Sequence, residues 1–204
     1  VLSRRQRQMC IRDRCTSIFK LESSLLPVLL DMKQRGVRVD IDKAEQVKKE
    51  LLTREKILLE EIRSETGVVV EPWVATSVAK AFDALGLKYH RTEKTDAPAF
   101  TKQFLANHDH PIAKKIVRLR EFNKANTTFV ETILEHSHNG RIHCDFNPLR
   151  SDEGGTVTGR FSSSNPNLQQ IPARDPEIKA MIRGLFIPED GYKWGSFDLS
   201  LIHI

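Results

Sequence analysis

The spacing of the apolar residues changes near residue 140, and this change constrains the fold more than any other feature of the chain. Before it, apolar side chains recur every three or four positions, as at Val47, Leu51 and Leu58, which is the spacing of one helix face. After it, the stretch "HNGRIHCDF" combines an Asn-Gly turn signal with the alternation of a strand. We therefore predict an α+β chain, in which a helical part precedes antiparallel strands.

The helical part contains signals for the ends of helices. Gly36, Gly67 and Gly86 each follow an apolar-periodic segment, and glycine is favoured just past a helix terminus. Three helices are therefore expected to end at these glycines. Pro27 lies inside the first of them and predicts a kink or a break, because proline lacks the backbone N–H that a helix interior uses.

Signals for the starts of helices are also present. Asp42 with Glu45 forms an Asp version of a capping box, so the second helix is expected to begin there. Pro111 suits the first turn of a helix whose apolar stripe continues to about Glu135. Residues 88–99 are polar and without a period, which predicts a loop.

The charge of the chain is unevenly placed. The whole sequence carries 32 basic and 27 acidic residues, a net charge of +5, which would suggest a nucleic-acid partner. Five of the arginines and one aspartate lie in residues 1–14, however, so the remainder is nearly neutral. Residues 1–14 show no helical or strand period and are interpreted as a non-native or disordered arm. Residues 199–204 are interpreted as a non-native tail.

Other features of the sequence mainly exclude classes of protein and of site. No apolar run approaches the ~20 residues of a membrane span. The three cysteines lie at no metal-ligand spacing, and a reducing cytoplasm, that of the host for a phage-encoded protein, is the simplest location. The histidines are interpreted as solvated, and Trp73 and Trp194 as partial core anchors.

The stretch "GGTVTGRFSSSNPNLQQIPAR", residues 154–174, is the most unusual part of the sequence. It is too polar for a core, and it lacks the Gly-Lys-Ser/Thr ending of a phosphate-binding P-loop. Arginine with hydroxyl and amide side chains suits the phosphates, sugars and minor-groove acceptors of a nucleic acid. A polar loop network that fixes a turn explains the composition equally well, so both interpretations stay open on composition alone.

The order of the residues favours the first interpretation. The segments "TGRFSSSNPNLQQIPAR" and "IRGLFIPEDGYKWGSFD" closely resemble the family A DNA polymerases, the DNA polymerase I-like enzymes, and above all their phage branch. A weaker resemblance to the thumb of that family extends through "LESSLLPVLLDMKQRGVRVD" and "HPIAKKIVRLREFNKANTTFVETIL". The resemblance implies a DNA-directed DNA polymerase, a nucleotidyltransferase, with a helical thumb at residues 15–140 and the incomplete start of an antiparallel palm at 141–198.

The resemblance also implies which side chains contact DNA. Arg160 and Gln169 would touch the minor groove near the primer end, and Asn167 would hold nearby backbone. Four residues would face the duplex from a thumb helix, namely Lys124, Asn126, Thr127 and Thr128, although Lys124 can equally be a solvated helix charge. Arg174 and Arg183 are further candidates for duplex or template contacts, with surface ion pairs as their alternative role.

Asp198 is the candidate catalytic residue. In the family that this sequence resembles, the matching aspartate is the first catalytic carboxylate and a ligand of Mg²⁺, in two-metal nucleotidyl transfer. The sequence departs from the family after this residue, since "LSLIHI" stands where Tyr-Ser-Gln-x-Glu is expected. The family's fingers and its second carboxylate motif do not occur in these 204 residues.

We therefore expect this chain to bind primer–template DNA without synthesising DNA by itself, with deoxynucleoside triphosphates as partners of the complete enzyme. The alternative is a non-catalytic helical module that binds duplex DNA. A nuclease finds little support, because no paired acidic motif occurs before residue 140.

Overall fold

The structure is a computed structural model that describes residues 4–148 and 154–197, with side chains from residue 16 onward. The chain divides into two compact units. The first, called the helical unit, comprises residues 40–135 and 172–185. The second, the strand unit, comprises the residues up to Val39, residues 136–171 and the residues from Phe186 onward. Each unit is described separately.

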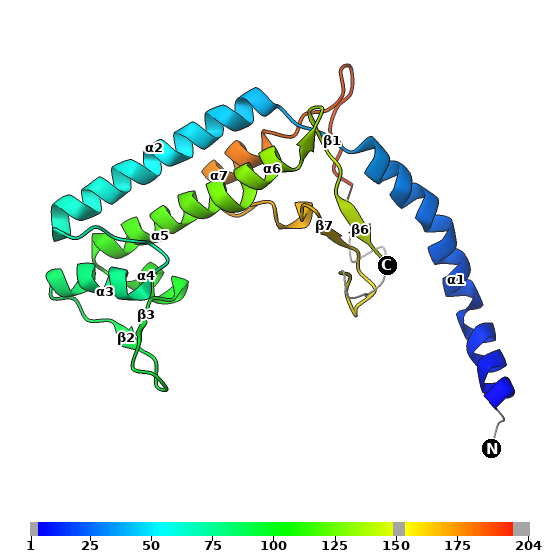
Figure 1. The fold of residues 1–204 in the computed structure, drawn as a ribbon, viewed down its shortest axis with the longest axis horizontal. Helices are drawn as coiled ribbons and strands as arrows, with labels where there is room; N and C mark the ends of the chain where they lie inside the picture. The colour runs from blue at the N-terminus through cyan, green and yellow to red at the C-terminus, as the bar shows by residue number, and fades with distance from the viewer. Residues whose placement is uncertain (1–3, 149–153, 198–204) are drawn as a thin grey trace. The chain divides into compact units, whose positions relative to one another are not determined.

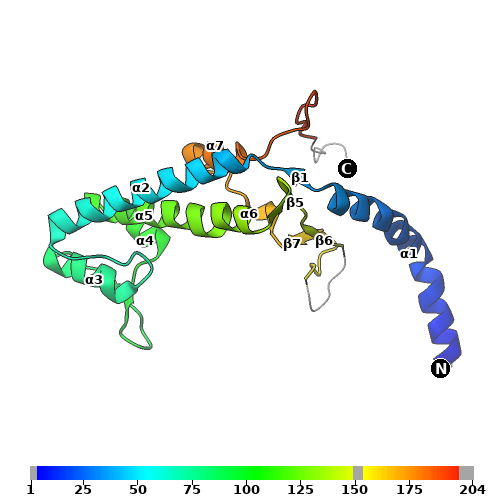
Figure 2. The same cartoon turned by 45° about the horizontal axis from the view of Figure 1, so that its top comes forward.

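The helical unit is built around two long helical segments. Helix α2 lies beside helix α5, and α5 continues through a π-helix, η1, into α6 (Figures 1 and 2). The elements of this unit are α2 (Ile41–Thr66), α3 (Ala75–Ala84), β2 (His90–Arg91), β3 (Pro98–Ala99), α4 (Lys102–Asn107), α5 (Pro111–Lys124), η1 (Ala125–Val130), α6 (Glu131–Glu135) and α7 (Pro176–Arg183).

Helix α2 begins and ends at specific capping residues. Asp40 is its N-cap and accepts a hydrogen bond from the backbone N–H of Lys43, so the expected cap at Asp42 was wrong by two residues. Asp42 lies instead in the first helical turn, where its charge complements the helix dipole. The predicted end at Gly67 is confirmed, since this residue has φ +70° and its N–H bonds to the carbonyl of Arg63.

The core of the helical unit lies between α2, α3, α4 and α5. Its centre is Phe82, which is fully buried and lies 4.8 Å from Phe100 between ring centroids. Phe100 directly follows β3, which pairs with β2 as a short antiparallel hairpin. The predicted loop at 88–99 is thus a hairpin whose end supplies an aromatic ring to the core.

In the described part of the strand unit there are one long helix and two small antiparallel sheets. Strands β1, β5 and β4 form one sheet in that order, and β6 pairs with β7 in the other. The Asn139-Gly140 pair, both residues at positive φ, connects β4 to β5 as the sequence predicted. The elements are α1 (Arg4–Arg35), β1 (Val37–Arg38), β4 (Ser137–His138), β5 (Arg141–Ile142), β6 (Asp145–Asn147), β7 (Ser162–Ser164) and the 3₁₀ turn η2 (Leu168–Gln170).

The end of helix α1 is fixed by Gly36. This glycine has φ +63°, and a Cβ atom there would approach the carbonyl oxygen of Ile142 and the ring of His143 to 2.7 Å. The confirmed stop at Gly36 therefore has two causes, a backbone angle that glycine tolerates and a close approach to β5. Helix α1 also passes through Pro27 without ending, so the proline does not break the element.

Three further expectations for the strand unit differ from the structure. Helix α1 begins at Arg4, inside the segment for which no helical period was found. Of its expected apolar face, Leu29 is buried, whereas Ile18, Leu21 and Met32 are exposed. Neither "GLFIP" nor "YKWGSFDL" forms a strand within the described residues, and Val39 and Phe186 make only an isolated β-bridge.

Candidate nucleic-acid interface

One face of the thumb-like helix carries three of the predicted DNA-contacting residues. Lys124, at the end of α5, and Thr127 and Thr128, in η1, are all exposed. Residues three and four apart lie on the same side of a helix, so the ammonium and the two hydroxyls share one surface. Lys124 pairs with no acid among the described residues, which leaves its charge free to meet an anion.

Asn126 does not share this exposure. Its side chain is only 2% exposed, and its Nδ2 donates a 3.3 Å hydrogen bond to Glu131, which also pairs with Lys48. The expectation that Asn126 faces the duplex does not fit this burial. Asn126 is buried because it lies on the apolar stripe of this helix, four residues after buried Phe122 and four residues before buried Val130.

The π-helix explains how this stripe is maintained. In a regular α-helix the eight steps from Phe122 to Val130 turn about 800°, which leaves Val130 about 80° away from Phe122. A π segment has more residues per turn, and η1 closes with a bond from the Glu131 N–H to the Asn126 carbonyl. The extra residue keeps Val130 on the core side, while Thr127 and Thr128 remain on the outer side.

Arg174 and Arg183 belong to the helical unit, although they were expected in the palm. Both are exposed, and the Arg183 Nε donates to the carbonyl of Pro172 at 3.1 Å. Neither forms an ion pair with an acid in the described part of the chain, so the alternative role as ion-pair partners is not observed there. Their guanidinium charges are available at the surface.

An ion-pair network holds the segment 172–185 in the helical unit. Glu177, on α7, binds both Arg54 of α2 and Arg118 of α5. Arg118 also binds Asp175 at 2.6 Å, and Asp175 caps α7 by accepting from the N–H of Ile178. The Arg54 hydrogen bond lowers the pKa of Glu177, and the cap bond to Ile178 lowers the pKa of Asp175.

The part of the polar stretch that lies in the strand unit, residues 154–171, contains a network of hydrogen bonds between side chains and between side chains and backbone. Asn167 caps η2 by accepting from the Gln169 N–H at 3.0 Å, and it also accepts from Ser163. Gln169 donates its Nε2 to the carbonyl of Phe161 at 3.0 Å. These two amides are exposed, but each is already engaged in fixing the loop.

Arg160 differs from the amides around it. Its carbonyl accepts from the Thr156 hydroxyl at 2.7 Å, which fixes its backbone, while its side chain is exposed. It pairs with no acid among the residues that the structure describes. The structure thus brings Arg160, Asn167 and Gln169 together in one loop and gives the guanidinium no acidic partner within residues 4–148 and 154–197.

Trp73 and Asn123 were not predicted as neighbours of this interface. The Trp73 side chain is 57% exposed, so its interpretation as a core anchor was wrong, and Trp194 is likewise exposed. Trp73 donates its Nε1 to the Asn123 side chain at 2.7 Å. A sequence signal existed, because Trp73 lies between two helical segments and outside both apolar stripes.

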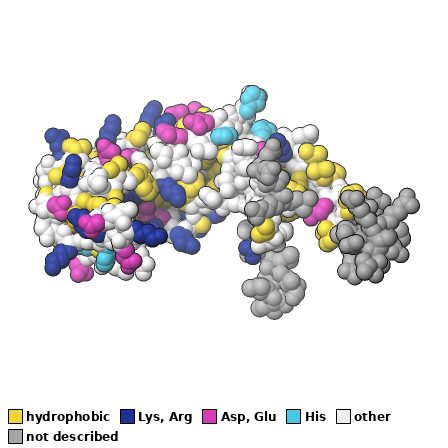
Figure 3. All heavy atoms as spheres, turned by 60° about the horizontal axis from the view of Figure 1, so that its bottom comes forward, with side chains coloured by type: hydrophobic (Ala, Val, Ile, Leu, Met, Phe, Trp, Pro, Cys, Tyr) yellow, Lys and Arg dark blue, Asp and Glu magenta, His cyan; other side chains and the backbone are white. Residues whose placement is uncertain are grey.

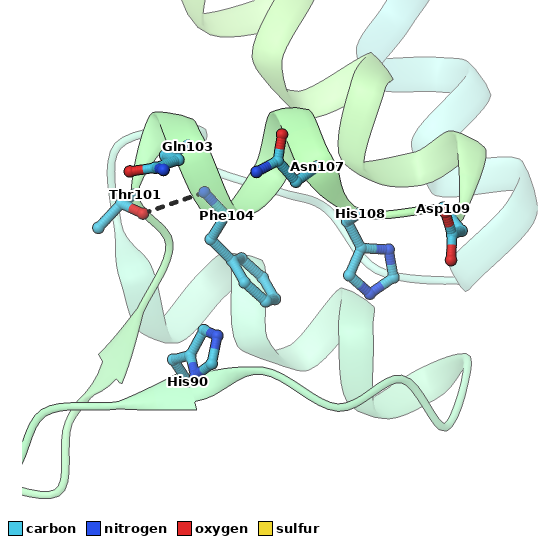
Figure 4. A pocket seen from close by; sticks show the side chains of 7 residues that line it. All are labelled: His90, Thr101, Gln103, Phe104, Asn107, His108 and Asp109. Carbon is cyan, nitrogen blue, oxygen red and sulfur yellow. Dashed lines mark hydrogen bonds between the residues drawn. The ribbon is translucent and has the colours of Figure 1, made fainter.

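A separate hollow lies near the β2–β3 hairpin and has a volume of about 490 Å³. Figure 4 shows its side chains, in which the ring of Phe104 lies between the imidazoles of His90 and His108. Among the described residues that line it, Asp109 is the acidic side chain, and neither a lysine nor an arginine is present. An anionic ligand would meet that carboxylate, so we do not assign phosphate binding to this hollow.

The surface charge of the helical unit is mixed. Figure 3 shows basic and acidic side chains interspersed over this unit on the face in view. A phosphate-binding surface is therefore a local feature made by unpaired cations rather than a broad basic patch.

No group of three metal-ligating side chains gathers within the described residues, and Asp198 lies outside them. Burial raises the pKa of the Cys144 thiol, which keeps this free cysteine protonated and unreactive. Among the helices described, none has the length and apolar character of a membrane span.

Known proteins provide the comparison for this geometry. The family model for DNA polymerase family A matches residues 41–204. A DNA-directed DNA polymerase of Pseudomonas phage M6 is 38% identical over 98% of this chain and 31% of its own length. The DNA polymerase DpoZ of Acinetobacter phage SH-Ab 15497 is 34% identical over 89% of this chain and 32% of its own length. The thermostable DNA polymerase I of Thermus filiformis is 34% identical over 91% of this chain and 22% of its own length.

A solved structure agrees with these relatives. The POL domain of Pol1 from M. smegmatis, in complex with a DNA primer-template and dNTP, has a TM-score of 0.70 and 25% sequence identity over 89% of this chain and 33% of that chain. The chain thus spans about a third of the length of its phage relatives. The family match covers most of the chain, and the mixed helical and antiparallel architecture agrees with it, so this chain belongs to DNA polymerase family A.

Proposed function

We propose that this chain supplies the duplex-binding part of a template-directed DNA polymerase, with the helical unit as thumb and the strand unit as the start of the palm. The observation that carries the proposal is the face formed by Lys124, Thr127 and Thr128, which is exposed and free of acidic partners among the described residues. It lies within the segment that matches the family model. The related Pol1 domain was solved with a DNA primer-template and dNTP, which supports the same class of partners for this chain.

Each side chain has a role that follows from its chemistry. The Lys124 ammonium neutralises a backbone phosphate, and the hydroxyl of Thr128 donates a hydrogen bond to a phosphate oxygen. The Thr127 hydroxyl donates to the Asn123 carbonyl at 2.9 Å, so its part is to shape the same face beside Lys124. Arg160 reaches the minor groove from a loop that Asn167 and Gln169 fix, and these amides can add contacts of their own. Phosphate contacts carry no sequence information, and the minor groove presents a degenerate pattern of acceptors, which suits an enzyme that must copy any template.

Asp198 is proposed as the first catalytic carboxylate and as a ligand of Mg²⁺ in the complete polymerase. A divalent cation there would stabilise the charge that develops on the phosphoryl oxygens during nucleotidyl transfer. The described residues offer no metal cluster of their own, so their proposed roles are to bind and orient the duplex.

The binding half of this proposal is tested with the 204-residue chain and a fluorescently labelled primer–template duplex. Fluorescence anisotropy is measured between about 50 and 200 mM salt, and log Kd is plotted against log salt concentration. Lys124→Gln should reduce the slope by about 0.9, the contribution of one phosphate contact, whereas Lys124→Arg should retain it. Unchanged affinity and slope in Lys124→Gln would remove Lys124 from the interface.

The catalytic half needs the complete polymerase. We expect Asp198→Asn to abolish primer extension there while duplex affinity stays within about twofold, because the change is isosteric and removes one anionic ligand. The 204 residues alone should bind the duplex without extending a primer. Binding without synthesis by the complete protein as well would favour the alternative function, a non-catalytic duplex-binding module.

A further inference from the structure

Trp73 is held rigidly at the surface of the helical unit, which is unusual for a large apolar side chain. It lies on the segment between α2 and α3, and 57% of it is exposed. Its indole N–H bonds to the Asn123 Oδ1 at 2.7 Å, and the Arg120 guanidinium lies 5.5 Å from the centre of its ring. Arg120 is itself fixed, because it donates to the carbonyls of Pro72 and Phe100 at 2.6 and 2.8 Å.

The same contacts connect Trp73 to the proposed DNA-binding face. Asn123 directly precedes Lys124, and its carbonyl accepts the Thr127 hydroxyl at 2.9 Å. The Asn123 Nδ2 donates to Glu55, so both ends of this amide are engaged and its orientation is set. The indole therefore lies beside the surface that carries Lys124 and Thr127, and on the same unit.

From these contacts we propose that Trp73 is a further duplex-contacting side chain, whose indole packs against the sugar–phosphate backbone beside the phosphate bound by Lys124. This inference rests on the proposed duplex-binding function of the helical unit. It adds an apolar contact to a face whose other proposed contacts are a charged group and hydroxyl groups.

The chemistry of the site favours a nucleic-acid backbone as the occupant. A deoxyribose presents an apolar surface flanked by phosphates, and this face presents an apolar ring bonded to Asn123, the residue directly before the exposed Lys124. The indole N–H is already satisfied within the protein, so only the apolar part of the ring is offered to a partner. Because the ring is already fixed, binding orders few additional side-chain rotamers.

A protection experiment tests the contact directly, because the chain contains only two tryptophans. Trp194→Phe leaves Trp73 as the sole indole, and Trp73→Phe leaves Trp194 as the matched control. Quenching by acrylamide is measured for each chain with and without a saturating labelled duplex, whose binding is followed separately by anisotropy. We expect the duplex to lower the quenching constant of Trp73 at least twofold.

An affinity experiment separates contact from support of the fold. Trp73→Ala should weaken duplex binding about tenfold while the salt slope stays unchanged, because no phosphate contact is lost. Lys124→Gln should show the opposite pattern, a reduced slope. Trp73→Phe should retain most of the affinity, and Val69→Ala, which alters an exposed residue of the same segment, should bind as the unaltered chain does. Thermal unfolding of each variant reports the fold independently.

The outcomes are distinct. If the duplex binds and Trp73 remains fully accessible to acrylamide, the inference is wrong although the proposed function stands. The inference is also wrong if Trp73→Ala and Trp73→Phe, both folded, retain the affinity of the unaltered chain. If no duplex binds under any salt condition, the proposed function of the helical unit fails, and the inference fails with it.

Discussion

Replacing Glu177 by glutamine tests how the segment 172–185 is held in the helical unit. Glu177 is the only residue of α7 that binds two arginines among the described contacts, Arg54 on α2 and Arg118 on α5. Glutamine keeps the shape and one acceptor oxygen but removes the charge. Each arginine would keep another acid, because Arg118 also pairs with Asp175 and Glu121, and Arg54 also pairs with Glu50. The loss is therefore limited to the two charge interactions of Glu177 itself.

The magnitude follows from the exposure of these groups. The Glu177 side chain is 44% exposed, and those of Arg54 and Arg118 are 33% and 27% exposed, so solvent screens both pairs in part. Partly exposed ion pairs contribute roughly 0.5 to 1 kcal/mol each. Glu177→Gln should therefore lower the free energy of unfolding by about 1 kcal/mol at pH 7. Glu60→Gln, in the more exposed pair with Arg63, is the matched control and should cost less than about 0.5 kcal/mol.

The pH dependence gives a sharper test. The pKa of Glu177 is lowered in the folded chain, so its stabilisation is present above the unfolded-state pKa, about 4.3, and is lost as pH falls through the folded-state value. Urea unfolding followed by circular dichroism should show the difference of about 1 kcal/mol at pH 7 and convergence of the two chains as the pH falls below the folded-state pKa of Glu177. A difference that persists unchanged at low pH would show that Glu177→Gln acts by some means other than charge.

Four further substitutions test the fold. Asp40→Ala removes the N-cap of α2 and should lower the free energy of unfolding in urea by about 1 kcal/mol. Asp42→Ala should lower it by only roughly 0.3 to 0.5 kcal/mol, because only an interaction with the helix dipole is lost. Equal losses would contradict the assignment of Asp40 as the cap. Phe82→Ala should cost about 3 to 5 kcal/mol, and a cost below about 1 kcal/mol would be incompatible with the buried aromatic centre. Asn126→Leu should leave the free energy of unfolding equal or higher, because the Asn126 Oδ1 is buried without a partner among the described residues. A decrease in the free energy of unfolding above about 2 kcal/mol would show that the amide is required.

Local signals allowed the helix ends to be predicted, but not the assembly of the units. Gly36 and Gly67 were correct because a positive φ at a helix end is a property of a few neighbouring residues. The return of α7 to the helical unit was missed, because it depends on pairs such as Arg54 with Glu177, 123 positions apart in the chain. Apolar period alone contains no information about such partners.

The error at Asn126 has a different physical cause. The sequence predicted four residues on one helix face, namely Lys124, Asn126, Thr127 and Thr128. Neighbouring residues of a helix point in different directions, so all four cannot face the same side. The π-helix then fixes which of them turn inward, and its extra residue cannot be found with a period of 3.6. The exposed set that remains is smaller than the predicted one, and it is chemically more uniform, with one cation and two hydroxyls.

The polar stretch at 154–174 left two interpretations open, and the structure shows the hydrogen bonds that the loop-network interpretation requires. The nucleic-acid interpretation stays a proposal, and Arg160 is the residue best suited to it. Asn167 and Gln169 bond to the backbone of their own loop, as the loop-network interpretation requires. Arg160 is fixed at its carbonyl by Thr156, and its charged end is free of described acids. A loop of this kind can hold a guanidinium in place for a ligand at little cost in backbone entropy on binding. The network and the nucleic-acid interpretations are therefore complementary, because the amides that fix the loop are what would orient Arg160 toward a duplex.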